Sequence, residues 1–389
     1  MRGYVRKRGN KWSYTVDVGK DPITGKRKQK TKGGYDTEKE AEAALNETIY
    51  ELNKGLYVEP QKIIMKDFAT DWYDGYKHNL RTTTSEQYDA KIKKWIIPIL
   101  GHYKVQDIKP VHGQMMIKRL LTELKPNTAH KVLAITKMIL TYAVDLEIII
   151  KNPFTKTTLK NPKRDVDTWD FDDLQHFLKV TKRYEPFYYG IFAVAAYTGL
   201  RKGEILGLSK SSVVSEYDRK SRKTKHKIIV KQSVAETKEK GVYLDKVKTP
   251  SSYRHVAIDS FIYTILDEQI KKNNELKLKF GPDYQDNDLI FCHKDGVIFR
   301  PSSLNRPFRR MIERSGVPYI RFHDLRHTHA TLLLEMNTNP KIVADRLGHS
   351  SVKITLDTYS HTSVDMQMDI ADQFSTMARK TSRGRDVVK

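Results

Sequence analysis

The stretch KNPFTKTTLKNPKRDVD, residues 151 to 167, constrains the fold more than any other part of this sequence. It contains two Asn-Pro breaks and five basic residues, a composition that interrupts helices and strands and is typical of a linker. One hydrophobic core is therefore not expected to continue across it. In a chain of 389 residues, the break predicts two or three separately packed domains.

The segment before this linker, residues 61 to 153, has the apolar spacing of a helical domain. Residues 83 to 86 (TTSE) fit a capping box ahead of one helix, Pro98 and Gly101 are expected to break the chain, and Pro110 opens another helix. After Pro126, apolar residues recur at helical intervals, namely Val132, Ile135, Ile139 and Tyr142. The pattern predicts a four-helix domain.

The first 57 residues are strongly basic. Eleven Lys and Arg residues stand against two Asp residues in positions 1 to 32, a local charge of +9. Residues 11 to 19 (KWSYTVDVG) alternate as a strand face should, residues 26 to 34 can return as a second strand, and residues 35 to 55 predict a helix capped by Asp36 or Thr37. We expect a small basic sheet backed by one helix, which would bind DNA; a solvated charged tail is the alternative.

The remaining block, from residue 168 to about 378, mixes predicted helices and strands. Residues 170 to 180 and 186 to 197 predict helices, and 226 to 258 contain strand-like runs. Residues 288 to 299 (DLIFCHKDGVIF) resemble a hairpin with Lys-Asp-Gly at its turn, and residues 302 to 316 predict a helix ended by Gly316. The expected architecture is mainly α with a small antiparallel sheet.

The charge balance indicates the class of partner. Seventy Lys and Arg residues against 47 Asp and Glu residues give a formal charge of +23, which favours a polyanion: nucleic acid first, an anionic membrane surface second. No apolar run of about 18 residues occurs, and the first residues lack a secretory signal, so a cytoplasmic protein is expected. The single cysteine, Cys292, lies in the apolar run LIFCH, where a buried structural thiol is expected.

Two cationic stretches could serve a phosphate-transfer site, which needs fixed positive charges and groups that handle protons. In YTGLRKGEILGL, Arg201 stands between a Thr-Gly turn and a helix, where its guanidinium could bind a phosphate; taken alone, it is more often a surface residue. Glu204 could orient Arg201 or stabilise the helix N-terminus. In IRFHDLRHTHATLLL, His323 and Arg326 are three apart and share a helix face.

The remaining candidates are His349, in LGHSS, and Tyr359, in TYSH. Either could simply cap a turn or fill a core. A zinc site at His323 and His327 is not expected, because no HExxH glutamate, thiolate or tight carboxylate cluster accompanies them.

In combination, these stretches resemble the tyrosine recombinases, the phage-integrase family of site-specific DNA recombinases. The family's order of Arg, Lys, His-x-x-Arg, His and Tyr is found here as TGLRKGE, VKTPSSYRHVAI, HDLRHTHAT, LGHSS and TYSH. The basic N-terminal stretch is similar to the three-stranded arm-site domain of integrases from Gram-positive temperate phages and conjugative elements. The helical segment is similar to their core-binding domain.

The resemblance implies a role for each site residue. Arg201 and Arg326 would clamp the phosphate, Tyr359 would attack it, His323 would help manage the tyrosine proton, and His349 would hydrogen-bond the phosphate. Lys248 would protonate the leaving 5′ oxygen, although Lys246 and Lys240 lie close to it in the sequence. Glu204 would be the family's acidic residue that contacts the arginines and not the phosphate. Candidate DNA contacts in the arm domain are Arg6, Arg8, Lys11, Trp12, Tyr14, Arg27, Lys28 and Lys30.

The resemblance also implies domains, partners and a reaction. The expected domains are an arm-type DNA-binding domain (1–57), a core-binding domain (61–153), a linker (154–167), a catalytic domain (168–378) and a basic tail (379–389). A homotetramer would exchange strands between core-type and arm-type attachment sites through a 3′-phosphotyrosine and a Holliday junction. It would integrate and excise a mobile element, with a DNA-bending or excision protein as possible accessory.

The chemistry needs neither a metal nor ATP, because guanidinium groups can stabilise the phosphoryl oxygens and the phosphotyrosine conserves the bond energy. The expected site of action is the nucleoid of a bacterial host. A type IB topoisomerase and a non-catalytic DNA-binding regulator remain alternatives.

Overall fold

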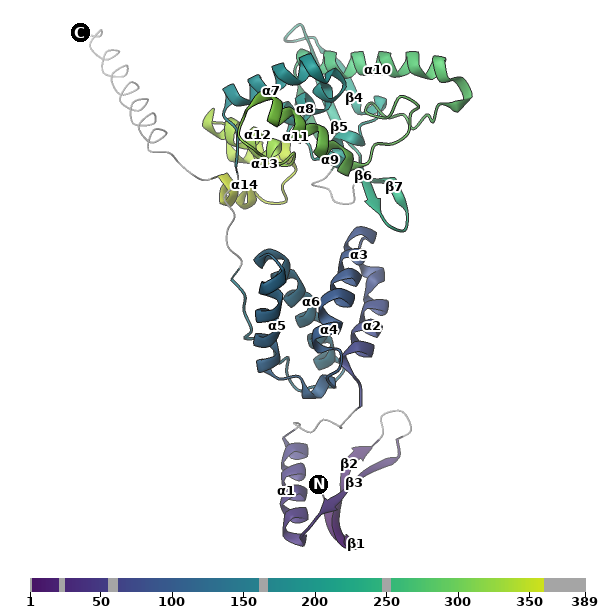
Figure 1. Ribbon diagram of the computed structural model, residues 1–389, viewed down its shortest axis with the longest axis vertical. Helices are drawn as coiled ribbons and strands as arrows, with labels where there is room; N and C mark the ends of the chain where they lie inside the picture. Colours follow the sequence, from purple (N-terminus) through teal and green to yellow (C-terminus); the bar gives the residue numbers. More distant parts are fainter. Residues whose placement is uncertain (1, 21–24, 55–61, 161–166, 247–252, 360–389) are drawn as a thin grey trace, which may run out of the picture. The chain divides into compact units, whose positions relative to one another are not determined.

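The computed structural model describes residues 2–20, 25–54, 62–160, 167–246 and 253–359; of Lys20 and residues 357–359 it describes the backbone only. The chain divides into two compact units, Met1–Lys163 and Arg164–Lys389 (Figure 1). None of the helices in the described residues is long and apolar enough to cross a membrane.

The N-terminal part is a three-stranded antiparallel sheet with one helix. Strands β1 (Gly3–Arg8), β2 (Lys11–Lys20) and β3 (Arg27–Tyr35) pair in that order, and α1 (Glu38–Asn53) packs on β2. Thr37 caps α1 by accepting the amide of Glu40 at 3.2 Å. Tyr14, Val16 and Leu45 form the small core between sheet and helix. The predicted sheet and helix are confirmed, while the predicted Asp-Pro turn lies in 21–24, outside the described residues.

A helical part follows in the same unit. It contains α2 (Met65–Tyr76), α3 (Thr82–Lys91), α4 (Ile97–Leu100), α5 (Pro110–Glu123) and α6 (Pro126–Asp145). Proline opens α5, as predicted, and also α6, since the first helical position needs no amide donor. Phe154 is fully buried in this core, so the chain still packs on the helical part at a position assigned to the linker.

Two local predictions for this part were wrong. Helix α3 begins at Thr82 with Arg81 as its N-cap, so Thr83 lies inside the first turn and no capping box forms. Pro98 does not break the chain, because a π-helical turn, Ile92–Ile96, connects α3 directly to α4. The amide of Ile97 bonds to the carbonyl of Ile92 there, and this wider turn accommodates the amide that proline lacks.

In the second unit, the other helices pack around the buried helix α8 (Pro186–Thr198). Helices α7 (Phe171–Tyr184), α9 (Lys202–Leu206), α10 (Ser260–Phe280) and α12 (Asp324–Glu335) contact α8, and α11 (Asn305–Ser315) packs on α7. The chain then continues through α13 (Pro340–Leu347) and α14 (Val352–Tyr359). Aromatic side chains of Trp169, Phe177, Phe192 and Phe308 meet in the core.

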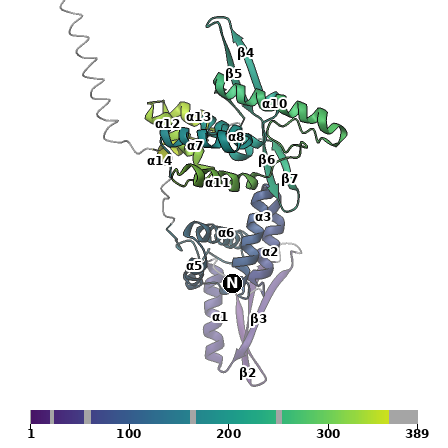
Figure 2. The same ribbon diagram turned by 45° about the horizontal axis from the view of Figure 1, so that its top comes forward.

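Two small antiparallel sheets complete this unit. One has the order β4-β5-β8, from strands Val213–Asp218, Lys223–Val230 and Arg254–Ile258, and the β4–β5 hairpin projects beyond the helices (Figure 2). The other is the hairpin of β6 (Gln232–Thr237) and β7 (Gly241–Lys246). The hairpin predicted at 288–299 is reduced to one antiparallel bridge, Cys292 to Ile298. Cys292 is buried, as predicted, and burial raises the pKa of its thiol.

Candidate active site

The sharp turn between α8 and α9 sets the position of Arg201. Gly199 ends α8 with φ +64°, a left-handed conformation that glycine adopts without strain. A Cβ at this position would lie 2.5 Å from Leu347 Cδ2 and 2.8 Å from His329 Cδ2. The glycine therefore allows both the turn and the close approach of α12 and α13, and Arg201 follows as the N-cap of α9.

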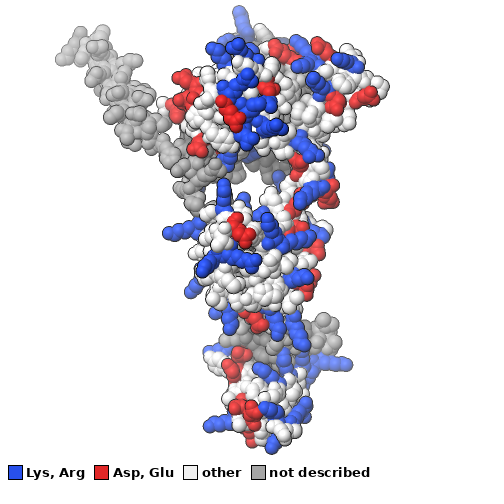
Figure 3. Space-filling view, viewed as in Figure 1, with Lys and Arg blue, Asp and Glu red and all other residues white. Residues whose placement is uncertain are grey.

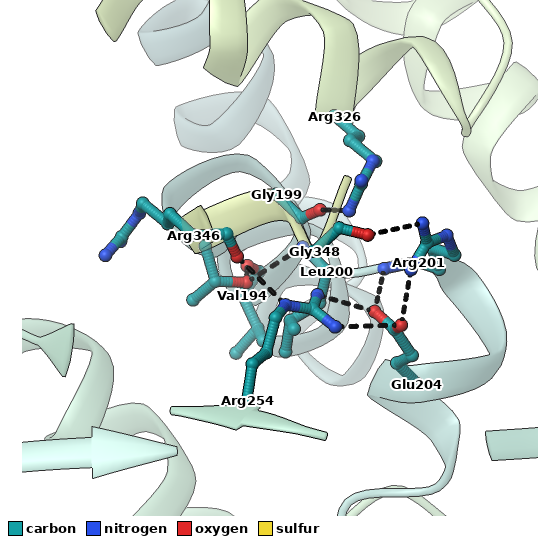
Figure 4. Close-up of polar contacts among 10 residues, drawn as sticks. Val194, Gly199, Leu200, Arg201, Glu204, Arg254, Arg326, Arg346 and Gly348 are labelled. Atoms are coloured by element: carbon teal, nitrogen blue, oxygen red, sulfur yellow. Dashed lines mark hydrogen bonds and ion pairs between the residues drawn. The ribbon is translucent and has the colours of Figure 1, made fainter. Parts of the chain in front are cut away.

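Glu204 holds Arg201 by two hydrogen bonds. The Arg201 amide donates to Glu204 Oε2 and its Nη1 to Oε1, both at 2.8 Å, while Nη2 donates to the Gly348 carbonyl at 3.3 Å (Figure 4). The Arg201 side chain keeps 40% of its surface exposed, against 4% for Glu204. Glu204 therefore both contacts the Arg201 guanidinium and accepts the Arg201 amide at the start of α9.

Arg326 approaches the same turn from α12. It is 3% exposed, and its Nη1 donates to the Gly199 carbonyl at 2.8 Å. His323 is the N-cap residue of α12, and its ring lies edge-on to His327 with centroids 5.2 Å apart. The structure thus brings Arg326 to the turn that carries Arg201, although 125 residues separate them.

In the described residues, no three His, Cys, Asp or Glu side chains form a group able to hold a metal ion.

His349 follows the left-handed cap Gly348 at the end of α13. Its Nδ1 lies 2.8 Å from the hydroxyl of Thr355, a fully buried residue of α14. Burial, and then the positive charges of Arg326 and Arg201, lower the pKa of His349 to about 4. His349 is therefore neutral at pH 7, and it is tied to the helix that ends at Tyr359.

Two arginines that sequence reasoning missed complete this network. Arg254, the first residue of β8, donates Nη1 and Nη2 to the two oxygens of Glu204 at 3.1 and 2.9 Å (Figure 4). Its Nε donates to the carbonyl of Arg346 at 2.9 Å. Arg346 in turn donates to His329 Nε2 and to the carbonyls of Tyr197 and Ala257. Arg254 was visible only as one more cation in a basic segment, with no spacing to distinguish it.

The buried histidine His329 makes stability depend on pH. Burial above all lowers its pKa to about 3, and its Nε2 accepts from Arg346 Nε at 3.0 Å. Because an unfolded histidine titrates near 6.5, the unfolded chain binds more protons than the folded chain between about pH 6.5 and 3. The free energy of unfolding therefore decreases as the pH is lowered through that window. His329 should contribute up to about 1.4 kcal/mol per pH unit.

His329→Gln should therefore flatten the pH dependence of unfolding, since an amide oxygen can accept from Arg346 without titrating. We would measure denaturant unfolding of the full chain at pH 7, 6 and 5 and at constant ionic strength. His130→Gln, at an exposed position on α6, is the matched control and should leave the slope unchanged. Equal slopes for the unsubstituted chain and His329→Gln would contradict the assignment.

The other two predicted catalytic residues fall at the edge of the described structure. Lys248 lies in 247–252, outside the described residues, and Tyr359 is described by its backbone alone, as the last residue of α14. The β6–β7 hairpin, which precedes Lys248 in the sequence, packs against α9. A Cβ on Gly203 would lie 2.5 Å from Ser233 Oγ, and one on Gly207 would lie 3.0 Å from Ser233 Cα. Of the two other lysines near Lys248 in the sequence, Lys246 ends β7 and Lys240 directly precedes it.

The predicted arm-domain contacts separate onto two faces of the sheet. Tyr14 is 5% exposed and shares a 2.8 Å hydrogen bond with Thr48 of α1, so it belongs to the core rather than to a DNA-binding face. Lys30 pairs with Val16 and lies on that same side of the sheet. Arg6, Arg8 and Lys11, from alternate register positions, lie on the open side.

Several of the arm-domain candidates contact other side chains of the same domain. Lys11 also contacts Asp36, and Arg27 contacts Asp17 at 2.6 Å. Trp12 is half-buried with Lys7 5.9 Å above its ring, and Lys28 is exposed on β3. On the face shown in Figure 3, Lys and Arg side chains are spread over every folded part of the chain.

Fold and site together define a class. A basic sheet, a helical part and a mainly-α unit lie on one chain, and the last of these joins two arginines and a neutral histidine beside a helix ending in tyrosine. This arrangement is that of a DNA-strand transferase of the tyrosine type.

Comparison with known proteins identifies the family. Residues 168–366 match the phage integrase family, residues 4–52 an arm DNA-binding domain, and residues 65–121 a phage integrase N-terminal SAM-like domain. The chain belongs to the phage integrase family, and its activity is tyrosine-type site-specific DNA recombination. A topoisomerase or a non-catalytic regulator is not favoured.

Relatives extend along nearly the whole chain. A tyrosine recombinase XerC-like protein of Caldanaerobacter subterraneus is 28% identical over 90% of this chain and 92% of its own length. The ICEBs1 integrase of Bacillus subtilis is 26% identical over 94% of this chain and 97% of its own length.

Solved structures share the fold. The Tn1549 transposon integrase, in complex with a circular intermediate DNA, covers 80% of this chain and 100% of its own with TM-score 0.67 and 19% identity. A lambda integrase tetramer bound to a Holliday junction covers 92% of this chain and 96% of its own, with TM-score 0.57 and 16% identity. The predicted fold class is confirmed.

Proposed function

We propose that this chain cuts and rejoins DNA through Tyr359, whose phenol oxygen attacks the scissile phosphorus. The new bond is a 3′-phosphotyrosine, and the bond to the 5′ oxygen breaks, with a proton supplied to that oxygen by Lys248. A 5′ hydroxyl of another strand reverses the reaction and completes the exchange through a Holliday junction. The supporting observation is the meeting of Arg201, Arg326 and His349 beside two left-handed glycine caps, Gly199 at the end of α8 and Gly348 at the end of α13.

The charges beside these two glycine caps would stabilise the transition state of this reaction. Arg201 and Arg326 offer two fixed guanidinium groups to the phosphoryl oxygens, which gain negative charge as the fifth bond forms. His349 is neutral at pH 7, because its pKa is lowered to about 4. If the Thr355 hydroxyl donates to Nδ1, then Nε2 carries the hydrogen and can donate it to a phosphate oxygen.

His323 suits a different task. Loss of solvent around its ring, followed by the charges of His327 and Arg326, lowers its pKa to about 4. A neutral imidazole can accept the proton that a tyrosine phenol, with a pKa near 10 in water, must lose to become a nucleophile. We therefore assign His323 to that proton and Glu204 to the orientation of Arg201.

We also propose the assembly and its partners. Residues 1–57 would bind arm-type sites, residues 61–153 core-type sites, and residues 168–378 would catalyse strand exchange within a homotetramer that integrates and excises a mobile element. An arm DNA-binding match and a neighbour solved as a tetramer on a Holliday junction support this assembly. A DNA-bending or excision protein would set direction, and the reaction would take place on the nucleoid of a bacterial host.

The proposal is tested by trapping the covalent intermediate. A nicked DNA substrate that loses its short 5′-hydroxyl strand after cleavage would hold the adduct. Peptide mapping should then locate the phosphodiester on Tyr359. An adduct on another residue, or none with the substrate bound, would refute the mechanism.

The open side of the N-terminal sheet should contribute to arm-site binding through Arg6 and Arg8. Both are exposed on β1, on the side opposite α1. Changing both to alanine should reduce the slope of log K against log salt by about 2, because each phosphate contact releases about one counterion. Full-length protein would be titrated with arm-site DNA at several salt concentrations.

A second pair of basic residues provides the control. Lys39 and Lys54 are exposed on α1 and just after its end, so their double alanine variant removes the same charge away from the sheet. Its salt slope should stay nearer the original value. Equal losses in both variants would mean that total charge, not the sheet, governs binding.

A further inference from the structure

The Glu204 carboxylate lies between two arginines, and only one of them reaches solvent. The Glu204 side chain is 4% exposed and accepts from both Arg201 and Arg254 (Figure 4). Arg254 is 6% exposed and uses both terminal nitrogens on Glu204, whereas Arg201 is 40% exposed and uses only Nη1. One negative charge thus meets two positive charges, and the excess lies on the exposed guanidinium.

The contacts of Arg254 fix it in this position. Besides Glu204, its Nε donates to the carbonyl of Arg346, near the end of α13. Arg346 is itself held by the carbonyls of Tyr197 and Ala257. Since Arg254 is almost fully buried, its guanidinium does not offer a surface to DNA, and any effect on the reaction must pass through a neighbour.

Removal of Arg254 would change what Arg201 has to do. Glu204 would remain buried with Arg201 as its charged partner, and a buried carboxylate that loses one of its two counter-charges is destabilised. The Arg201 guanidinium would then be drawn toward both Glu204 oxygens. A guanidinium whose charge is offset by Glu204 in this way interacts less with a phosphate. A small displacement of it also misaligns the reacting groups.

We propose that Arg254 is a positioning residue that supplies the counter-charge of Glu204, so that the charge of Arg201 remains available to the scissile phosphate. The inference rests on the proposed role of Arg201 in cleavage. Arg254 also begins β8, and it follows Lys248 by six residues in the sequence.

The experiment is a double-mutant cycle on cleavage of the nicked substrate, with enzyme in excess and well below the unfolding temperature. Arg254→Met should slow cleavage about 10- to 100-fold. Arg254→Met combined with Glu204→Gln should cleave at least about fivefold faster than Arg254→Met alone, because no carboxylate then competes for Arg201. A double variant as slow as the product of the two single effects would overturn the proposal.

A neutral phosphate separates this role from a purely structural one. On a substrate with a methylphosphonate at the scissile position, the ratio between unsubstituted chain and Arg254→Met should shrink to about threefold or less, because less negative charge must be stabilised. An equal ratio on both substrates would mean that Arg254 only supports the fold. If Arg254→Met does not fold, Arg254→Lys, which keeps the charge without the paired contact, should show an intermediate rate and the same narrowing.

Arg310→Met is the control, because it removes a partly exposed guanidinium paired with Glu185, away from the network. It should cleave at the unsubstituted rate. An unsubstituted chain that forms no adduct would refute the proposed function itself. An active chain whose folded Arg254→Met variant cleaves normally would refute only the role of Arg254.

Discussion

Phenylalanine in place of Tyr359 should abolish covalent attachment to DNA, with cleavage reduced by at least about 10⁴-fold, the scale expected when a nucleophile is removed. Site binding should stay within about threefold, because it depends on many phosphate contacts. The substitution deletes one oxygen and keeps the ring, so the end of α14 should be little disturbed. The measurement is adduct formation on the nicked substrate, beside a titration of binding to intact DNA.

Three hydroxyl residues near the tyrosine in sequence provide the controls for this result. Thr358→Val and Ser360→Ala remove the adjacent hydroxyls, and both variants should still form the adduct. Thr355→Val removes the hydroxyl that meets His349 Nδ1, so it should slow cleavage without moving the site of attachment. Persistent adduct in Tyr359→Phe would mean that another group is the nucleophile.

Arg201 and Arg326 could be predicted because each lies in a short local motif and the motifs together resemble one family pattern. Arg201 follows a Thr-Gly turn, and the structure shows why: Gly199 adopts φ +64° where a Cβ would meet Leu347 and His329. The spacing of His323 and Arg326 predicts one shared helix face; His323 is the N-cap of α12, and Arg326 lies in its first turn. Local backbone requirements of this kind leave a signal that spacing can detect.

The residues that connect these motifs left no such signal. Arg254 reaches Glu204 across 50 residues, and Thr355 of α14 meets His349, just after the end of α13, through a side-chain contact. Spacing also could not tell a core tyrosine from a DNA-contacting one, because Tyr14 alternates correctly for either face of β2. The side of the sheet that α1 covers is decided by tertiary packing, which a strand pattern does not contain.

Arg326→Ala should slow cleavage by about 10²- to 10³-fold, a loss of about 2.7–4 kcal/mol of transition-state stabilisation. Arg326 is 3% exposed and donates Nη1 to the Gly199 carbonyl, so its guanidinium is held before substrate arrives and needs little reorganisation. Arg326→Lys keeps the charge but loses the planar, two-pronged donor. Its rate should fall between those of the alanine variant and the unsubstituted chain, measured as single-turnover cleavage.

Stability and binding must be measured beside this rate, since removal of a buried side chain also leaves a cavity. Arg314→Ala provides the comparison, because Arg314 stacks 3.6 Å above the Tyr184 ring at an exposed place on α11. That variant should cleave normally. If Arg326→Ala binds the site and unfolds at the original temperature, a lost rate is a lost interaction with the transition state. A folded Arg326→Ala variant that cleaves at the unsubstituted rate would leave Arg201 as the principal cation of the site.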